Sequence, residues 1–274
     1  MSARRALITA LFDDAALFPP GNASMAGAVH GHQEYRQRWY TASIGPFVCP
    51  DARLPELDQA LAAAGVDRLD VALTVPGGHP ALAGALEAAR LTRRVRVVAV
   101  EVLLGSAPVA AVAAALDPSI AGYVEVPAAE LHAGLAAQLG TSGLRLKLRT
   151  GGTAAAAFPT EDQLAAALTC AAGQGLPVKC TAGLHHAVRH RDPATGFEHH
   201  GFLNIVLAVH AALTSADVRA ALAEQDGTSV AAAVRALDAP RIAAVRAVFR
   251  SFGTCGIDEP LADLAALDLL DATP

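Results

Sequence analysis

The sequence predicts an α/β protein whose parallel strands and helices alternate along the chain and close into a single (β/α)8 TIM-type barrel. Three observations favour this fold. The chain has 274 residues, 53% of them hydrophobic, which is enough for one such barrel domain spanning residues 1–274. Strand-like and helix-like segments alternate with short links, which is typical of a parallel sheet. The GxGxxG motif that usually follows the first strand of a doubly wound sheet is absent.

The expected elements begin with a strand at 6–12, a loop containing Pro19 and Pro20, and a helix at 24–40 with Ser24 as its N-cap. The next strands are expected at 44–50, 68–75, 95–104 and 122–127, and then around Lys147 and around Lys179. The helices between them are expected at 54–64, 80–91, 108–116, 128–139 and 160–173.

The pattern loosens after the Lys179 strand, where residues 185–201 are expected to form an extended loop at the top of the barrel. Because links in such folds usually have about 2–6 residues, we expect this loop to cover the barrel mouth and bring His185 or His186 near the lysines. Residues 202–213 fit a strand or a buried helix, which periodicity does not separate. The remaining expected elements are helices within 215–250, a strand within 249–256 and a helix near 260–270.

Ionisable residues occupy one face of five expected strands. Side chains alternate between the two faces of a strand, so a polar residue with apolar neighbours points away from the helices. The residues expected to point into the barrel are Asp70, Glu101, Glu125, Lys147 and Lys179. Buried charges are costly unless they are paired, so this set is either a structural salt-bridge network or a catalytic cavity. We favour the cavity, because barrel active sites lie at the carboxyl ends of the strands.

Two lysine motifs, Lys147-Leu-Arg-Thr-Gly151 and Lys179-Cys-Thr-Ala-Gly183, stand 32 residues apart on successive strands. Over about residues 120–185 this arrangement resembles the class I (Schiff-base) aldolases of the deoxyribose-phosphate aldolase kind. The resemblance implies that Lys147 forms a Schiff base with the substrate carbonyl, that Lys179 is its electrostatic neighbour and that Glu125 moves protons. Leu184, His185 and His186 replace part of that family's glycine-rich phosphate loop, and Arg149 places a cation where the family has none. The identity of the substrate, and phosphate in particular, therefore does not carry over.

The residues support the same chemistry without the family. A lysine must be neutral to attack a carbonyl, and its ordinary pKa is about 10.4. Apolar walls and a second ammonium nearby both favour the neutral amine. We therefore expect an aldolase-like lyase that makes or breaks a carbon–carbon bond of a small aldehyde or keto substrate and needs no cofactor.

Further side chains are expected to contact this small-molecule substrate. They are Asp70, Glu101, Arg149, Thr181, His185, His186 and Arg189. Arg149 and Arg189 are suited to a carboxylate or phosphate, which favours an anionic substrate.

Two alternatives stay open. Six histidines lie between His185 and His210, and a metal-dependent lyase or hydrolase would use such residues with carboxylates, for example His185, His186 and Asp14 around a divalent metal. The second alternative is a non-catalytic barrel that binds a ligand.

Charge and hydropathy limit the partners. The net charge of −5 and the absence of a basic run argue against nucleic acid. No apolar run reaches the roughly 20 residues that a membrane helix needs. Asp13 and Asp14 interrupt the apolar start of the chain before a signal-peptide core forms, and the four cysteines include no CxxC pair, so we expect a cytoplasmic protein with free thiols. The sequence leaves a homo-oligomer open.

Overall fold

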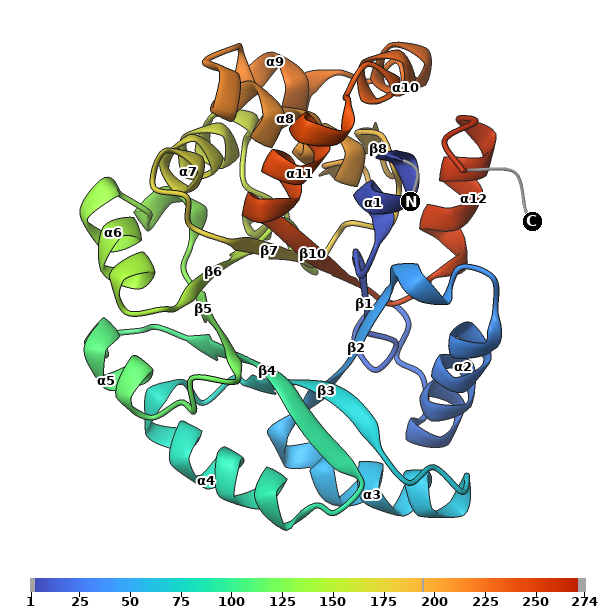
Figure 1. Ribbon diagram of the computed structural model, residues 1–274, viewed down its shortest axis with the longest axis vertical. Helices are drawn as coiled ribbons and strands as arrows, with labels where there is room; N and C mark the ends of the chain where they lie inside the picture. The colour runs from blue at the N-terminus through green and yellow to red at the C-terminus, as the bar shows by residue number, and fades with distance from the viewer. Residues whose placement is uncertain (1–2, 194, 271–274) are drawn as a thin grey trace.

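Eight parallel strands close into a barrel in the computed structural model, which describes residues 3–193 and 195–270 (Figure 1). Around the barrel the order is β1-β10-β7-β6-β5-β4-β3-β2, so each strand neighbours the one before it in the chain and β10 closes the ring between β7 and β1. The strands are β1 (Phe12–Asp14), β2 (Ile44–Pro50), β3 (Leu69–Val75), β4 (Val95–Leu103), β5 (Ala121–Glu125), β6 (Arg145–Arg149), β7 (Val178–Thr181) and β10 (Phe249–Thr254). The predicted (β/α)8 barrel is therefore confirmed.

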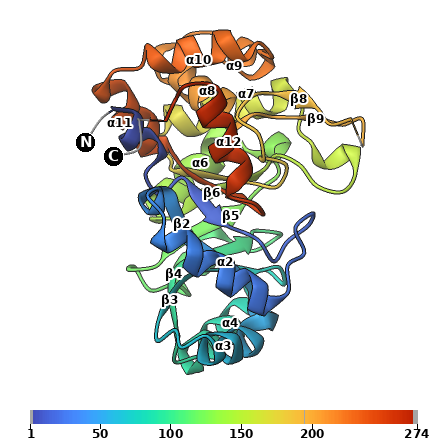
Figure 2. The same cartoon turned by 90° about the vertical axis from the view of Figure 1, so that its right-hand side faces the viewer.

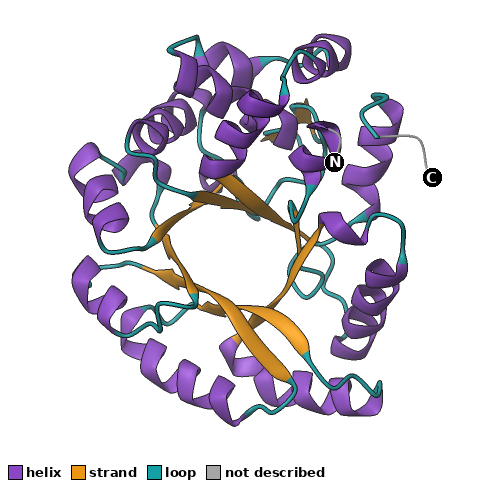
Figure 3. Cartoon of the chain, viewed as in Figure 1, coloured by secondary structure: helices purple, strands orange, loops and turns teal. Residues whose placement is uncertain are grey.

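Helices surround the strands on the outside of the ring (Figure 3). They are α1 (Ala3–Ile8), α2 (Met25–Gln37), α3 (Leu54–Ala63), α4 (His79–Leu91), α5 (Val109–Ala114), α6 (Ala133–Thr141), α7 (Glu161–Gly173), α8 (Phe202–Thr214), α9 (Val218–Ala223), α10 (Gly227–Arg235), α11 (Ala239–Val248) and α12 (Asp258–Ala266). Local signals account for several starts: the Ser24 side chain caps α2, and Thr160 with Gln163 forms a capping box on α7. No helix in the described part of the chain is both long enough and apolar enough to cross a membrane.

The main apolar core lies between the strands and the helices. Leu146 and Leu148 of β6 are fully buried in it, on the face opposite Lys147. A smaller apolar group formed by Ala15, Val48, Ala72, Ala99 and Tyr123 packs separately. Ala99 and Tyr123 lie two residues before Glu101 and Glu125 on the same faces of β4 and β5, so these two residues lie on the amino-terminal side of those carboxylates.

The start of the chain differs from the expected strand at 6–12. Residues Ala3–Ile8 form α1, a turn at Ala10 with φ 47° follows, and the strand covers only Phe12–Asp14. The apolar run is shared between a helix that buries Leu7 and a strand that buries Phe12, and a run this short does not distinguish the two. As a result, Asp13 belongs to a barrel strand rather than to the loop after it.

Two other segments gain a definite structure. The expected helix at 128–139 is a short 3-10 turn, η3 (Ala128–Glu130), followed by α6, and 202–213 is helical as α8. The loop at 185–201 contains a small antiparallel hairpin, β8 (His190–Arg191) with β9 (Glu198–His199), which lies outside the barrel wall (Figure 2).

Candidate active site at the carboxyl end of the barrel

Five ionisable side chains from five strands meet inside the barrel and are called the ionic cluster here. They are Asp13 of β1, Glu101 of β4, Glu125 of β5, Lys147 of β6 and Lys179 of β7. Four of them are residues that the sequence pattern places on the inner face. The fifth, Asp13, was missed, because its strand is only three residues long and shows no alternation.

Lys147 contacts two carboxylates. Its Nζ lies 2.8 Å from Oε2 of Glu101 and 2.9 Å from Oε2 of Glu125. Both carboxylates belong to neighbouring strands on the same side of β6, and Glu125 is level with Lys147 in the strand register. The ammonium of Lys147 is therefore held by charge pairs on its β5 side.

Lys179 occupies the deeper position. Its Nζ lies 2.6 Å from Oδ2 of Asp13 and forms an ion pair with Oε1 of Glu101. The Ser251 hydroxyl donates to the same Asp13 oxygen at 2.8 Å. Since one oxygen of Glu101 contacts Lys147 and the other contacts Lys179, this carboxylate bridges the two ammonium groups.

Burial and pairing compete in setting the pKa values of the cluster. Burial raises the pKa of Glu101, but the two lysines outweigh it and lower that pKa to about 2. Burial lowers the pKa of Lys179, yet the carboxylates of Asp13 and Glu101 leave it raised. For Asp13, burial outweighs the attraction of Lys179, so its pKa is raised. Glu101 and Lys179 therefore form an ionised pair at neutral pH.

A glycine makes room for Asp13. A Cβ atom on Gly45, in the neighbouring strand β2, would lie 1.9 Å from Oδ1 of Asp13. No side chain other than hydrogen fits there while Asp13 keeps its contacts with Lys179 and Ser251. Sequence reasoning gives no signal for this glycine, because the clash involves a residue of another strand.

Exposure increases steadily from the deep lysine to the barrel mouth. The exposed fraction of the side chain is 1% for Lys179, 8% for Lys147, 18% for Glu125 and 51% for Arg149. Arg149 NH1 lies 3.8 Å from Oε1 of Glu125. Thr181, which is half-buried, pairs with Arg149 in the strand register. The cluster is thus open to solvent along the ends of β5, β6 and β7.

The loops that follow the two lysine strands pack directly against each other. The Thr150 hydroxyl donates to the carbonyl of Ala182 at 2.6 Å, and a Cβ atom on Gly151 would lie 3.0 Å from the Cα of Gly183. Ala182 and Gly183 have φ values of 65° and 75°, which an alanine adopts only at some cost in free energy. The glycine in each lysine motif therefore allows two backbones to touch at the mouth.

Asp70 lies away from this group. It is the second residue of β3, at the amino-terminal end of the strand, and its half-exposed carboxylate pairs with Arg96 of β4. Alternation predicts the face of a strand on which a residue lies but not whether that residue is near the mouth. Asp70 was therefore expected in the substrate site but is positioned at the opposite end of the barrel.

His185 and His186 face α12 rather than the lysines. His185 Nδ1 lies 3.1 Å from Oε2 of Glu259 and 3.7 Å from the Cys255 sulfur, and burial lowers the pKa of this histidine. His186 Nδ1 lies 3.1 Å from Oδ2 of Asp263. The two side chains attach the start of the long loop to α12, whereas we expected His185 or His186 to lie near the lysines.

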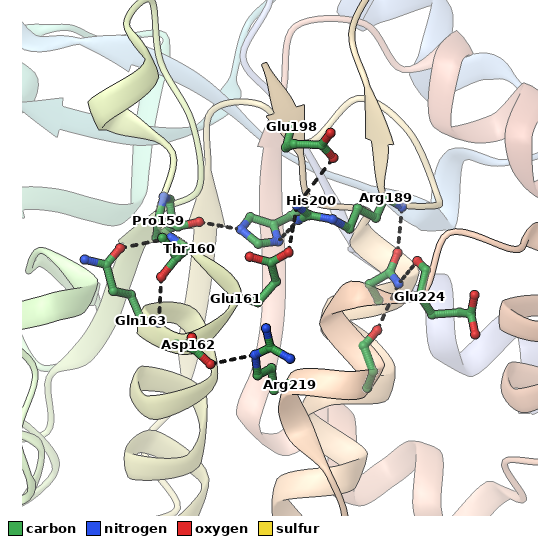
Figure 4. Close-up of polar contacts among 12 residues, drawn as sticks. Pro159, Thr160, Glu161, Asp162, Gln163, Arg189, Glu198, His200, Arg219 and Glu224 are labelled. Atoms are coloured by element: carbon green, nitrogen blue, oxygen red, sulfur yellow. Dashed lines mark hydrogen bonds and ion pairs between the residues drawn. The ribbon is translucent and has the colours of Figure 1, made fainter. Parts of the chain in front are cut away.

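Arg189 is buried within a polar network that joins the same loop to α7 and α8 (Figure 4). Its NH2 lies 2.8 Å from Glu161 and 3.4 Å from Glu198, and its backbone N–H donates to Oδ1 of Asn204 at 2.8 Å. Its NH1 approaches His200 at 3.4 Å. With these partners and little exposure, Arg189 anchors the loop, in contrast to the expected contact with an anionic substrate.

The proposed metal ligands do not converge. Asp14 is buried and its Oδ2 lies 2.9 Å from Nδ1 of His32, while His185 and His186 pair with separate acids of α12. Across residues 3–193 and 195–270, no group of three or more His, Cys, Asp or Glu side chains is arranged to hold a metal ion.

A cavity at the other end of the molecule is separate from the ionic cluster. It is lined by residues that precede β1 and β2, among them Arg4, Ile8, Trp39 and Tyr40. Because the strands start on that side, this cavity lies at the amino-terminal end of the barrel, away from Lys147.

Comparisons with known proteins give little guidance on activity. No family model matches the chain, and no curated protein matches it. Among solved structures, a dihydropteroate synthase of Xanthomonas albilineans, in complex with indole-2-carboxylic acid and 6-chloroguanine, is similar over 98% of this chain and 96% of its own. The sequence identity is 13% and the TM-score 0.42, so the likeness carries no inference about chemistry. The resemblance to Schiff-base aldolases therefore stays a prediction.

Proposed function

We propose that this protein is a lyase of the class I aldolase type, in which Lys147 forms a Schiff base with a small aldehyde or keto substrate. The observation that carries the proposal is the position of Lys147. Its amine lies at the partly open edge of the ionic cluster, 2.9 Å from the carboxylate of Glu125, which is itself partly exposed. A primary amine beside a proton acceptor at the carboxyl end of a barrel is what Schiff-base chemistry needs.

The amino-acid usage of the chain supports the same proposal. Lys147 and Lys179 are the two lysines among 21 Lys and Arg residues, so the chain uses arginine for every other strong cation. Arginine stays protonated and cannot attack a carbonyl, whereas lysine can once it loses a proton. A lysine could also be present only as a compact counter-ion between carboxylates. Lys147→Arg keeps the positive charge but removes the nucleophile, so it distinguishes these two roles.

The roles of the other groups follow from their contacts. Glu125 would accept the proton of Lys147 and return it when water leaves. Glu101 would hold both lysines in place, because its carboxylate touches each of them. Lys179 was expected to favour the neutral form of Lys147 as a like charge. Since Glu101 lies between the two ammonium groups, Lys179 would instead act on Lys147 through this shared carboxylate.

Formation of the Schiff base conserves atoms and charge. Lys147 gives one proton to Glu125, and the neutral amine attacks the carbonyl carbon to form a carbinolamine. Glu125 returns its proton to the hydroxyl, water leaves and a protonated imine remains. The positive imine then accepts the electron pair of the breaking carbon–carbon bond and becomes an enamine, while Glu125, again a carboxylate, takes the proton of the hydroxyl whose carbon is released as a carbonyl.

Borohydride trapping tests the proposal directly. The intact protein is incubated with a panel of small aldehydes and ketones, reduced, and analysed by mass spectrometry and peptide mapping. We expect one adduct per chain, on the peptide that contains Lys147. Lys147→Arg, which keeps a cation between Glu101 and Glu125, should lose the adduct while keeping the melting temperature.

Two results would contradict the proposal. An adduct that persists unchanged in Lys147→Arg would assign the reactivity to Lys179 or to the chain's amino terminus. No adduct with any carbonyl would favour the non-catalytic ligand-binding barrel or the metal-dependent enzyme.

A further inference from the structure

One carboxylate is shared between the proposed nucleophile and the most exposed cation of the mouth. Oε2 of Glu125 lies 2.9 Å from Nζ of Lys147, and Oε1 of the same group lies 3.8 Å from NH1 of Arg149. Lys147 and Arg149 are two residues apart on one face of β6. A new partner for Arg149 therefore changes the contacts of Glu125, the carboxylate that would accept the proton of Lys147.

This arrangement engages both carboxylates around Lys147. The ammonium has two carboxylate partners, and one of them, Glu101, is buried and already bridges to Lys179. Only Glu125 is placed to take the proton, and its other oxygen is engaged by the guanidinium of Arg149. An anion that replaced Glu125 as the partner of Arg149 would leave this carboxylate to Lys147 alone.

We propose that the substrate of this site is a small oxo acid, and that its carboxylate activates Lys147 by pairing with Arg149 in place of Glu125. This inference rests on the proposed Schiff-base function and names its substrate class. Arg149 is half-exposed and its planar fork suits a carboxylate. The amine of Lys147 and the guanidinium of Arg149 lie 2.9 Å and 3.8 Å from the two oxygens of one carboxylate, so a short acid can place its carbonyl at the amine and its carboxylate at the guanidinium.

The same proton moves from Lys147 to Glu125 as in the formation of the Schiff base, but it moves only after the substrate has bound. When the substrate carboxylate occupies Arg149, Glu125 is released from that partner and accepts one proton from Lys147. The amine then attacks the carbonyl already held beside it. A neutral ketone leaves Glu125 paired with Arg149 and meets an ammonium.

The test compares trapping rates for acid and neutral carbonyls in matched variants. The probes are pyruvate with acetone and 4-oxobutanoate with butanal, each trapped by borohydride and quantified on the Lys147 peptide. In Arg149→Gln we expect trapping of both acids to fall about 10- to 100-fold, the size typical of a lost charged hydrogen bond. Trapping of the neutral carbonyls should rise about 2- to 5-fold, because Glu125 is freed from its partly exposed partner.

Arg145→Gln is the matched control. Arg145 lies on the same strand, two residues before Lys147, so it is farther from the barrel mouth. Its guanidinium donates a hydrogen bond of 3.2 Å to the Tyr123 hydroxyl. The acid-to-neutral ratio of this variant should stay within about twofold of the wild-type ratio, which is within the effect of a typical surface substitution.

Opposite changes for acids and neutral carbonyls in Arg149→Gln would support the inference, because a purely structural role would change both alike. Equal losses for both probe types, an unchanged ratio, or an equally large change in Arg145→Gln would overturn it while the Schiff base stands. Absence of any Lys147 adduct in the wild-type protein would overturn the proposed function and the inference together.

Discussion

Replacing Glu101 by Gln tests whether the ionic cluster is held together by its bridging carboxylate. Glutamine keeps the size of the side chain and one acceptor oxygen but removes the negative charge. In the folded protein, the ammonium groups of Lys147 and Lys179 would then face each other across a neutral amide, with Glu125 and Asp13 as their remaining counter-ions. We expect a large loss of stability at neutral pH.

The magnitude follows from the environment of Glu101. Its side chain is almost fully buried, and the two lysines lower its pKa from an ordinary value of 4.5 to about 2 in spite of burial. A difference of this size corresponds to a free energy on the order of 3 kcal/mol. Removing one partner of a buried ion pair typically costs a similar amount, about 3–5 kcal/mol. The expected loss is a large part of the roughly 5–15 kcal/mol by which domains are usually stable.

The same substitution should change the response of the protein to acid. Because the folded-state pKa of Glu101 is depressed, its contribution is fully present above pH 4.5 and is lost as the pH falls through 4.5 toward about 2. Asp13 acts with the opposite sign, since burial raises its pKa and its protonation in acid favours the folded state. Glu101→Gln should therefore lose less stability between pH 5 and pH 3 than the wild-type protein does.

Urea unfolding, followed by circular dichroism at pH 7, 5 and 3, measures both effects. Glu87→Gln is the control, because Glu87 pairs with Arg90 on the exposed surface of α4 and its loss should leave the unfolding midpoint almost unchanged. A Glu101→Gln protein within about 1 kcal/mol of the wild type at pH 7 would refute the reasoning, because such a loss is no larger than that of an exposed pair.

Two further substitutions test the supports of the site. Gly45→Ala places a methyl group 1.9 Å from the Asp13 carboxylate, so we expect a loss of about 1–3 kcal/mol in the free energy of unfolding, together with weaker Lys147 trapping. An Ala variant as stable and as reactive as the wild type would show that Asp13 has room to move. Arg189→Gln removes the buried guanidinium that pairs with the partly exposed Glu161 and should cost about 1–3 kcal/mol, whereas Arg219→Gln on an exposed pair should cost less than about 1 kcal/mol, as judged from melting curves. Equal effects of the two arginine substitutions would mean that Arg189 does not anchor the loop.

The sequence by itself determined the barrel and the inner position of the two lysines. Both are consequences of local periodicity: strands and helices alternate along the chain, and side chains alternate along each strand. Lys147 and Lys179 lie on adjacent strands of a sheet in which chain order equals spatial order, so their proximity followed without any knowledge of the tertiary structure.

Only the tertiary structure decided which charges meet. Asp13 joins the ionic cluster because β1 closes the ring beside β10, which brings it to Ser251, a residue 238 positions away in the chain. Asp70 fits the same alternation as Glu101 but lies at the amino-terminal end of its strand. Periodicity indicates the face of a strand on which a residue lies and not its position along the barrel axis. The positive charge of Arg189 suits an anionic substrate, but its contacts with α7 and α8 make it an anchor of the loop. Pairing inside a barrel is determined by strand register and closure, and neither is a local property of the chain.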